Sequence, residues 1–125
     1  MADTVNEFFR KHYPADWNTA WEMEYCVGSG ARKYKGKEAE TIFPNMVCAD
    51  GLSLSVQGHW GAYSMPRDDF ADEYHAVEIM GPKKADELLA EYERDCNAVG
   101  DEMIYPYVPV RVVCAVIEKH GGLAV

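Results

Sequence analysis

Histidine side chains are the first candidates for chemistry in this sequence, because imidazole is a common metal ligand and general base. Metal ligands usually occur in pairs a few residues apart, and the four histidines form no such pair. A composite site built from His59, Asp68 and His75 would require three separate segments to meet. The sequence therefore predicts neither a metal site nor a bound cofactor.

The four cysteines are the next candidates, as nucleophiles. A reactive thiolate needs an electropositive and partly exposed setting. Cys114 lies in an apolar stretch and Cys96 lies among acids, so neither setting favours a thiolate. Cys26 and Cys48 are distant from both, and no two cysteines have C-x-x-C spacing. We interpret all four as reduced core residues.

Carboxylates are concentrated in one part of the chain. Twelve acids and three bases lie between Asp68 and Glu102, which gives this segment the whole net charge of the protein, −9. On a helix, Glu87, Glu91 and Asp95 would form one acidic stripe, which could steer a partner with a basic surface. The alternative is a solvated face without a partner. The acidity argues against direct binding of nucleic acid, because phosphates need a basic surface.

The segment 59–70 offers the best candidate binding surface. Trp60, Tyr63 and Arg67 are residue types that dominate binding hot spots, because each combines a large contact area with hydrogen bonding. Asp68 and Asp69 follow directly and could serve acid–base chemistry, but no phosphate cradle or sugar platform can be assigned beside them. The alternative is a packing role that closes one end of a sheet.

Hydrophobic spacing predicts the elements that position these residues. The expected helices are 4–13, 83–98 and 109–120, and the expected strands are 42–48, 52–57 and 74–80. Residues 17–27 fit both a helix and a strand, and Asp16 as N-cap slightly favours the helix. Residues 28–40 are rich in glycine and charge, which predicts a loop.

The expected fold class is α+β, with a small antiparallel sheet of three to four strands and helices packed on one side. A length of 125 residues predicts a single domain, 1–125. No apolar run has the length of a membrane span, and the first residues lack the pattern of a secretion signal. We therefore expect a cytoplasmic protein that does not bind membranes.

Five short segments resemble small phage and prophage proteins that have no assigned function: 51–57 (GLSLSVQ), 64–67 (SMPR), 77–79 (VEI), 107–110 (YVPV) and 117–122 (IEKHGG). The resemblance covers about residues 45–122 and leaves the N-terminal third without a counterpart. Where the family pattern has Cys-Ser-Pro-Arg, this chain has YSMPR. The resemblance implies a mobile-element setting and carries no functional residues with it.

Two hypotheses follow from the sequence. The first is a small accessory protein that binds a protein partner stoichiometrically through the acidic segment and the aromatic loop. Inhibition of a host system that handles nucleic acid, as by anti-CRISPR proteins, is one version of it. The second is a small-molecule-binding protein or small enzyme, with a cleft between the loop 59–69 and the strand face of Ser53, Ser55 and Gln57. A deep pocket with convergent polar groups would favour the second hypothesis.

Overall fold

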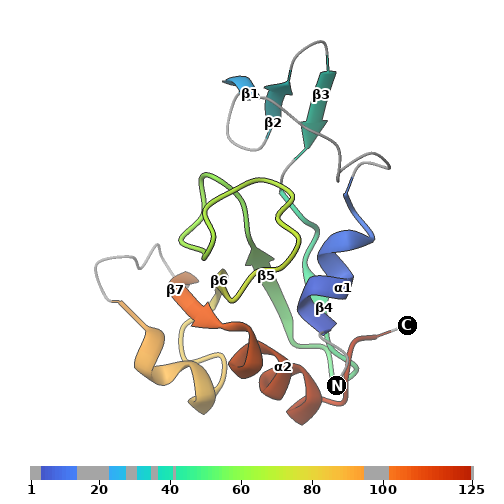
Figure 1. Ribbon diagram of the computed structural model, residues 1–125. Helices are drawn as coiled ribbons and strands as arrows, with labels where there is room; N and C mark the ends of the chain where they lie inside the picture. Colours follow the sequence, from blue (N-terminus) through green and yellow to red (C-terminus); the bar gives the residue numbers. More distant parts are fainter. Residues whose placement is uncertain are drawn as a thin grey trace.

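The computed structural model describes residues 4–13, 23–27, 31–34, 37–40, 42–94 and 102–124, with only the backbone for 23–40. Figure 1 shows the elements in chain order: α1 (Thr4–Arg10), β1 (Met23–Val27), β2 (Ala31–Tyr34), β3 (Lys37–Glu40), β4 (Met46–Val47), β5 (Ser53–Gln57), β6 (Ala76–Pro82), the 3₁₀ helix η1 (Glu87–Tyr92), β7 (Glu102–Pro109) and α2 (Val110–Lys119).

The main sheet is antiparallel and has the strand order β4-β5-β6-β7. Its first two strands form the expected hairpin, in which Met46 pairs with Leu54. The turn works because Gly51 adopts a φ of 97°, a left-handed conformation that glycine tolerates without steric cost. The Asp50 Oδ1 atom accepts a hydrogen bond from the Leu52 backbone N–H at 3.1 Å and closes the turn. The predicted hairpin is therefore confirmed.

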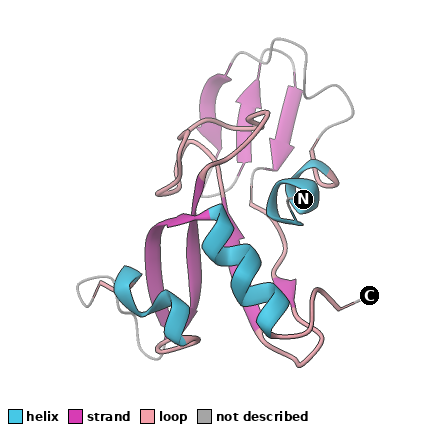
Figure 2. Cartoon of the chain, turned by 60° about the horizontal axis from the view of Figure 1, so that its bottom comes forward, coloured by secondary structure: helices cyan, strands magenta, loops and turns pink. Residues whose placement is uncertain are grey.

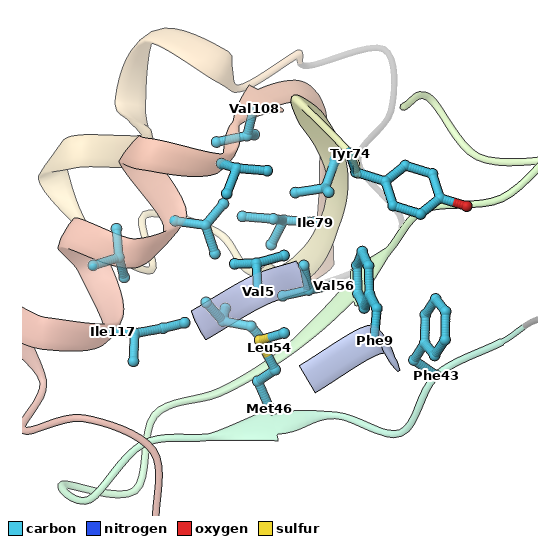
Figure 3. Packing of buried hydrophobic residues seen from close by; sticks show 14 of the residues in the cluster. Val5, Phe9, Phe43, Met46, Leu54, Val56, Tyr74, Ile79, Val108 and Ile117 are labelled. Carbon is cyan, nitrogen blue, oxygen red and sulfur yellow. The ribbon is translucent and has the colours of Figure 1, made fainter. Parts of the chain in front are cut away.

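The helices pack with this sheet around one hydrophobic core. Figure 2 shows α2 lying across the four-stranded sheet, and α1 contacts α2. Val5 and Phe9 from α1 are fully buried in the core cluster, as are Val113 and Val116 from α2. Figure 3 shows side chains from both helices and from β5, β6 and β7 meeting in this cluster. The expected α+β fold is confirmed, with apolar helix stripes covering the inner face of the sheet.

Two buried side-chain amides connect distant parts of the chain. The Asn6 amide donates to the Tyr74 carbonyl at 3.0 Å, and the Tyr74 N–H donates to Asn6 Oδ1 at 2.7 Å. Gln57 binds the backbone of Phe43 in the same way, with distances of 2.9 Å and 2.8 Å. Each amide satisfies one backbone donor and one backbone acceptor, as a neighbouring strand would.

The N-terminal region differs from the prediction. Residues 23–27 form strand β1, which is the strand alternative for 17–27 and not the slightly favoured helix. The predicted loop 28–40 contains strands β2 and β3. These strands form a second, three-stranded antiparallel sheet, which lies apart from the main sheet in Figures 1 and 2. Strands β2 and β3 are short and rich in charged residues, so they carry little apolar alternation and the sequence gives a weak strand signal there. Residues 17–22 lie outside the described part of the chain.

Two elements near the acidic segment also differ. The predicted α-helix 83–98 is the short 3₁₀ helix η1, because the chain returns to an extended conformation at Glu93, with φ −65° and ψ 142°. Residues 95–98 lie outside the described residues. Strand β7 was not predicted, because Pro106 and Pro109 interrupt its pattern and proline is rare inside strands.

Candidate functional site

The long connection 58–75 between β5 and β6 is fixed to the sheet by backbone hydrogen bonds. The Met65 N–H donates to the Ala76 carbonyl at 2.9 Å, and the His75 N–H donates to the Met65 carbonyl at 2.8 Å. On the other side, the Tyr107 N–H of β7 donates to the Tyr63 carbonyl at 3.1 Å. This connection is therefore an ordered structure with a defined path over β6 and β7.

Carboxylates complete this anchoring. Asp69 Oδ1 accepts from the Trp60 N–H at 3.0 Å, and Glu78 Oε1 accepts from the Tyr63 N–H at 3.2 Å. An ionised carboxylate can only accept hydrogen bonds, so it can bind backbone N–H groups that lie outside regular strand pairing. The Tyr74 hydroxyl donates to the Asp68 carbonyl, so Tyr74 also holds the loop from inside. Asp69 thus has a structural role, while the Asp68 residue is exposed.

Large apolar side chains are exposed on this ordered loop. Trp60, Tyr63 and Met65 of the loop expose 51%, 41% and 57% of their surfaces, and Tyr107 of β7 exposes 42%. Tyr63 and Met65 both adjoin Tyr107, and we call these three residues the aromatic surface. The rings of Tyr63 and Tyr107 lie 5.8 Å apart between centroids. The Arg67 guanidinium lies 5.6 Å from the centroid of the Tyr63 ring, a cation–π distance. The structure therefore brings together Tyr63 and Arg67, two of the predicted binding residues.

Tyr107 was missed by the sequence analysis, whereas Met65 lies in the predicted segment 59–70 without having been singled out. The β6–β7 register shifts between Val77 and Ile79, so that Glu78 faces two residues of β7, a β-bulge. Tyr107 lies in this bulge with a φ of 52°, a left-handed conformation that costs about 1 kcal/mol for a residue with a Cβ. In the sequence, only the position of Tyr107 between Pro106 and Pro109 indicates an unusual backbone there.

An open groove adjoins the aromatic surface. It has a volume of about 850 Å³ and is lined by Ser64, Met65, Pro66, Arg67, Glu73, His75 and Tyr107. Gln57, one of the residues of the predicted cleft against the face of β5, is buried and its amide is bound to Phe43, so it does not face a ligand. The cleft with Ser53 and Ser55 stays a prediction. The groove lies where the connection 58–75 meets Tyr107 of β7.

The predicted acidic stripe does not form as expected. Glu87 and Glu91 are exposed on η1, but a 3₁₀ helix has three residues per turn, so positions four apart fall on different faces. Asp95 lies outside the described residues. Glu93 Oε1 instead accepts from the Lys84 N–H at 2.9 Å, so this acid holds the backbone. The predicted steering role of Glu87, Glu91 and Asp95 stays a prediction.

His120 forms a second cluster of ionisable groups, at the C-terminal end of α2. Its Nδ1 atom lies 2.5 Å from Asp50 Oδ2 and its Nε2 atom lies 2.7 Å from Asp86 Oδ2. Lys119 Nζ is 3.2 Å from Asp86 and 3.3 Å from Glu87. Both imidazole nitrogens face carboxylates, so an imidazolium that donates twice fits best. Neither nitrogen is available as a general base, and the cluster connects the β4–β5 turn, η1 and α2.

The stability of the protein should depend on pH through this cluster. Hydrogen bonds to Asp86 and Asp50 raise the pKa of His120 above its ordinary value of 6.5. The imidazolium contribution is therefore complete below pH 6.5 and is lost as the pH rises through the higher folded-state pKa. Thermal unfolding between pH 6 and pH 9 should show a falling midpoint in the wild type and a smaller fall in His120→Gln. Parallel curves for the two proteins would show that the cluster does not titrate in this way.

The two aspartates give the opposite dependence on the acid side. The N–H of Leu52 and then His120 lower the pKa of Asp50. Burial acts to raise the pKa of Asp86, but hydrogen bonds from Leu88 and His120 outweigh it and lower that pKa below 3.8. Their contribution is present above pH 3.8 and is lost as the pH falls through the lowered values. The cluster should stabilise the fold most between about pH 4 and pH 6.5.

The remaining candidate sites give no further chemistry. Among the described residues, no group of three histidine, cysteine, aspartate or glutamate side chains could hold a metal ion. His59 is buried, and its Nδ1 accepts from the Gly61 N–H at 3.0 Å. Cys48 and Cys114 are free thiols, whereas the side chains of Cys26 and Cys96 lie outside the described part. No helix in the described ranges is long and apolar enough to cross a bilayer.

Comparisons with known proteins add no relative to this picture. Searches with protein-family models, against curated sequences and against solved structures gave no significant match. The function is therefore inferred from the geometry of the loop 58–75, its groove and its charges.

Proposed function

We propose that this protein acts by stoichiometric binding of a protein partner through the aromatic surface. The observation that supports this proposal is the combination of exposed aromatic and methionine side chains with a loop backbone fixed by hydrogen bonds. Tyrosine, tryptophan and methionine are enriched at protein interfaces. A loop that is already ordered loses little conformational entropy on binding, so more of the contact energy appears as affinity.

The proposed partner has a basic surface. Asp68, Asp72 and Glu73 are exposed on the same loop, and the whole chain carries a net charge of −9. Complementary charge mainly raises the rate of association. Glu87, Glu91 and Asp95 belong to this proposal as further steering residues. Inhibition of a nucleic-acid-handling system of a host cell is one form that such binding could take, in the phage setting that the sequence resemblance implies.

A double variant tests this proposal. Tyr63→Ala/Met65→Ala removes two exposed side chains of the aromatic surface, while Val47→Ala/Leu88→Ala removes two similarly exposed apolar side chains elsewhere. A partner captured by the wild type should bind the first variant about 30-fold more weakly, if each truncation costs about 1 kcal/mol. Binding to the control variant should remain close to that of the wild type, as measured by surface plasmon resonance.

The opposite pattern would contradict the proposal. If Val47→Ala/Leu88→Ala weakens the complex and Tyr63→Ala/Met65→Ala does not, the interface lies on another face. The open form of the groove supports the protein-binding hypothesis over the second one, a small-molecule site. Such sites usually enclose most of the ligand.

A further inference from the structure

We infer that the groove beside the aromatic surface accepts an apolar side chain of the partner that lies next to a lysine or arginine in the partner's sequence. This inference rests on the proposed function and adds the chemistry of the segment that is recognised. Three features of the groove support it: its lining, its charges and the state of its backbone groups.

The lining is mainly apolar. Met65, Pro66 and Tyr107 are among its lining residues, and Met65 and Tyr107 are both exposed. An apolar side chain that enters the groove removes these carbon surfaces from water, which is favourable. Methionine is flexible and polarisable, so Met65 can adapt to several apolar shapes. The groove is therefore suited to an aliphatic or aromatic side chain.

The charges around the groove favour a cation beside that side chain. Glu73 and Arg67 both line the groove directly. Between Arg67 and Glu78 there are five acids and one arginine: Asp68, Asp69, Asp72, Glu73, Glu78 and Arg67. This gives a local charge of −4, and the Arg67 guanidinium lies against the Tyr63 ring. An acidic segment would meet repulsion here, whereas a lysine or arginine would find Glu73 and its neighbours.

The backbone of the groove is already satisfied internally. The carbonyls of Met65, Pro66 and His75 accept hydrogen bonds from His75, the Ser64 hydroxyl and Val110, respectively. The N–H groups of Met65 and Tyr107 donate to Ala76 and Tyr63. These five backbone groups are therefore not available to a partner strand that would extend the sheet. We expect recognition through side chains, which predicts a sequence preference.

Peptide display measures that preference directly. A library of random peptides is selected against the folded wild-type protein and counter-selected against Met65→Asp, which introduces a charge at a side chain that is 57% exposed. The enriched peptides should share an apolar residue within one or two positions of lysine or arginine. A fluorescently labelled consensus peptide should bind Met65→Asp at least about tenfold more weakly than the wild type.

A second variant tests the cation. Glu73→Gln should weaken binding of the consensus peptide about two- to fivefold, as expected for an exposed ion pair, and should reduce its salt dependence. Glu118→Gln is the matched control, because it removes an exposed acid from α2 that is neither a groove-lining residue nor a proposed steering residue. Equal effects of Glu73→Gln and Glu118→Gln would overturn the assignment of the cation to the groove.

Other outcomes separate this inference from the proposed function. Enrichment of acidic peptides, or no enrichment relative to Met65→Asp, would overturn the inference. If partner capture still depends on Tyr63 and Met65 in that case, the proposed function stands and only the chemistry of the segment is wrong. If capture is independent of both residues, the proposed function fails whatever peptides are selected.

Discussion

Val113→Asp is expected to leave little folded protein at room temperature. Val113 is fully buried in the core cluster that joins α2 to the sheet. A carboxylate buried there loses its hydration without a compensating partner, which costs several kcal/mol of folding free energy. That penalty is comparable with the whole stability of a small domain, roughly 5–15 kcal/mol. Chemical denaturation monitored by circular dichroism should show loss of the folded baseline or a midpoint moved far toward zero denaturant.

The control for this substitution lies two residues away. Ala115 is exposed on the same helix, so Ala115→Asp adds the same charge without burying it. It should cost only about 0.5 to 1 kcal/mol, the difference in helix propensity. If both variants unfold at the same denaturant concentration, the orientation of α2 described above is incorrect.

Asn6→Ala is expected to be the second most destabilising change. Asn6 is buried in α1, and its amide satisfies both the N–H and the carbonyl of Tyr74. Removal of the amide leaves two backbone groups without these partners, and each unsatisfied buried group costs about 1 to 3 kcal/mol. The free energy of unfolding should therefore fall by about 2 to 4 kcal/mol. Equilibrium denaturation in urea measures this change.

Asn45→Ala is the matched control for Asn6. Asn45 is exposed, and its amide donates to the Ser53 hydroxyl at 3.0 Å. Because water replaces that hydrogen bond, the free energy of unfolding should change by less than about 0.5 kcal/mol. A loss for Asn6→Ala no larger than that of Asn45→Ala would mean that the link between α1 and Tyr74 carries no stability.

Local signals explain which parts of the fold could be predicted. The Asp50–Gly51 turn predicts its own hairpin, because the required positive φ is a property of the residue itself. Helix α2 was predictable because its apolar residues repeat at helical spacing over ten residues. By contrast, η1 has only six residues, and apolar spacing over so short a segment does not separate a 3₁₀ helix from an α-helix.

The candidate site was predictable in part. Tyr63 and Arg67 were found because their residue types alone mark binding surfaces. Tyr107 could not be found, because its exposure depends on a bulge opposite Glu78, a residue of another strand. The structural role of Asp69 could not be predicted either, because only the fold of the loop brings the Trp60 N–H to its carboxylate. Non-local pairing, rather than residue type, decides such positions.

The central claim is that the loop 58–75 is fixed before any partner arrives. Amide hydrogen exchange, followed by NMR on the free protein, tests it most directly at the N–H groups of Met65, His75 and Tyr107. Each of these groups donates to a backbone carbonyl in the structure. The account predicts protection comparable with that of the sheet amides in β5 and β6. Exchange of all three at the rate of an unstructured peptide, with the sheet amides still protected, would contradict it.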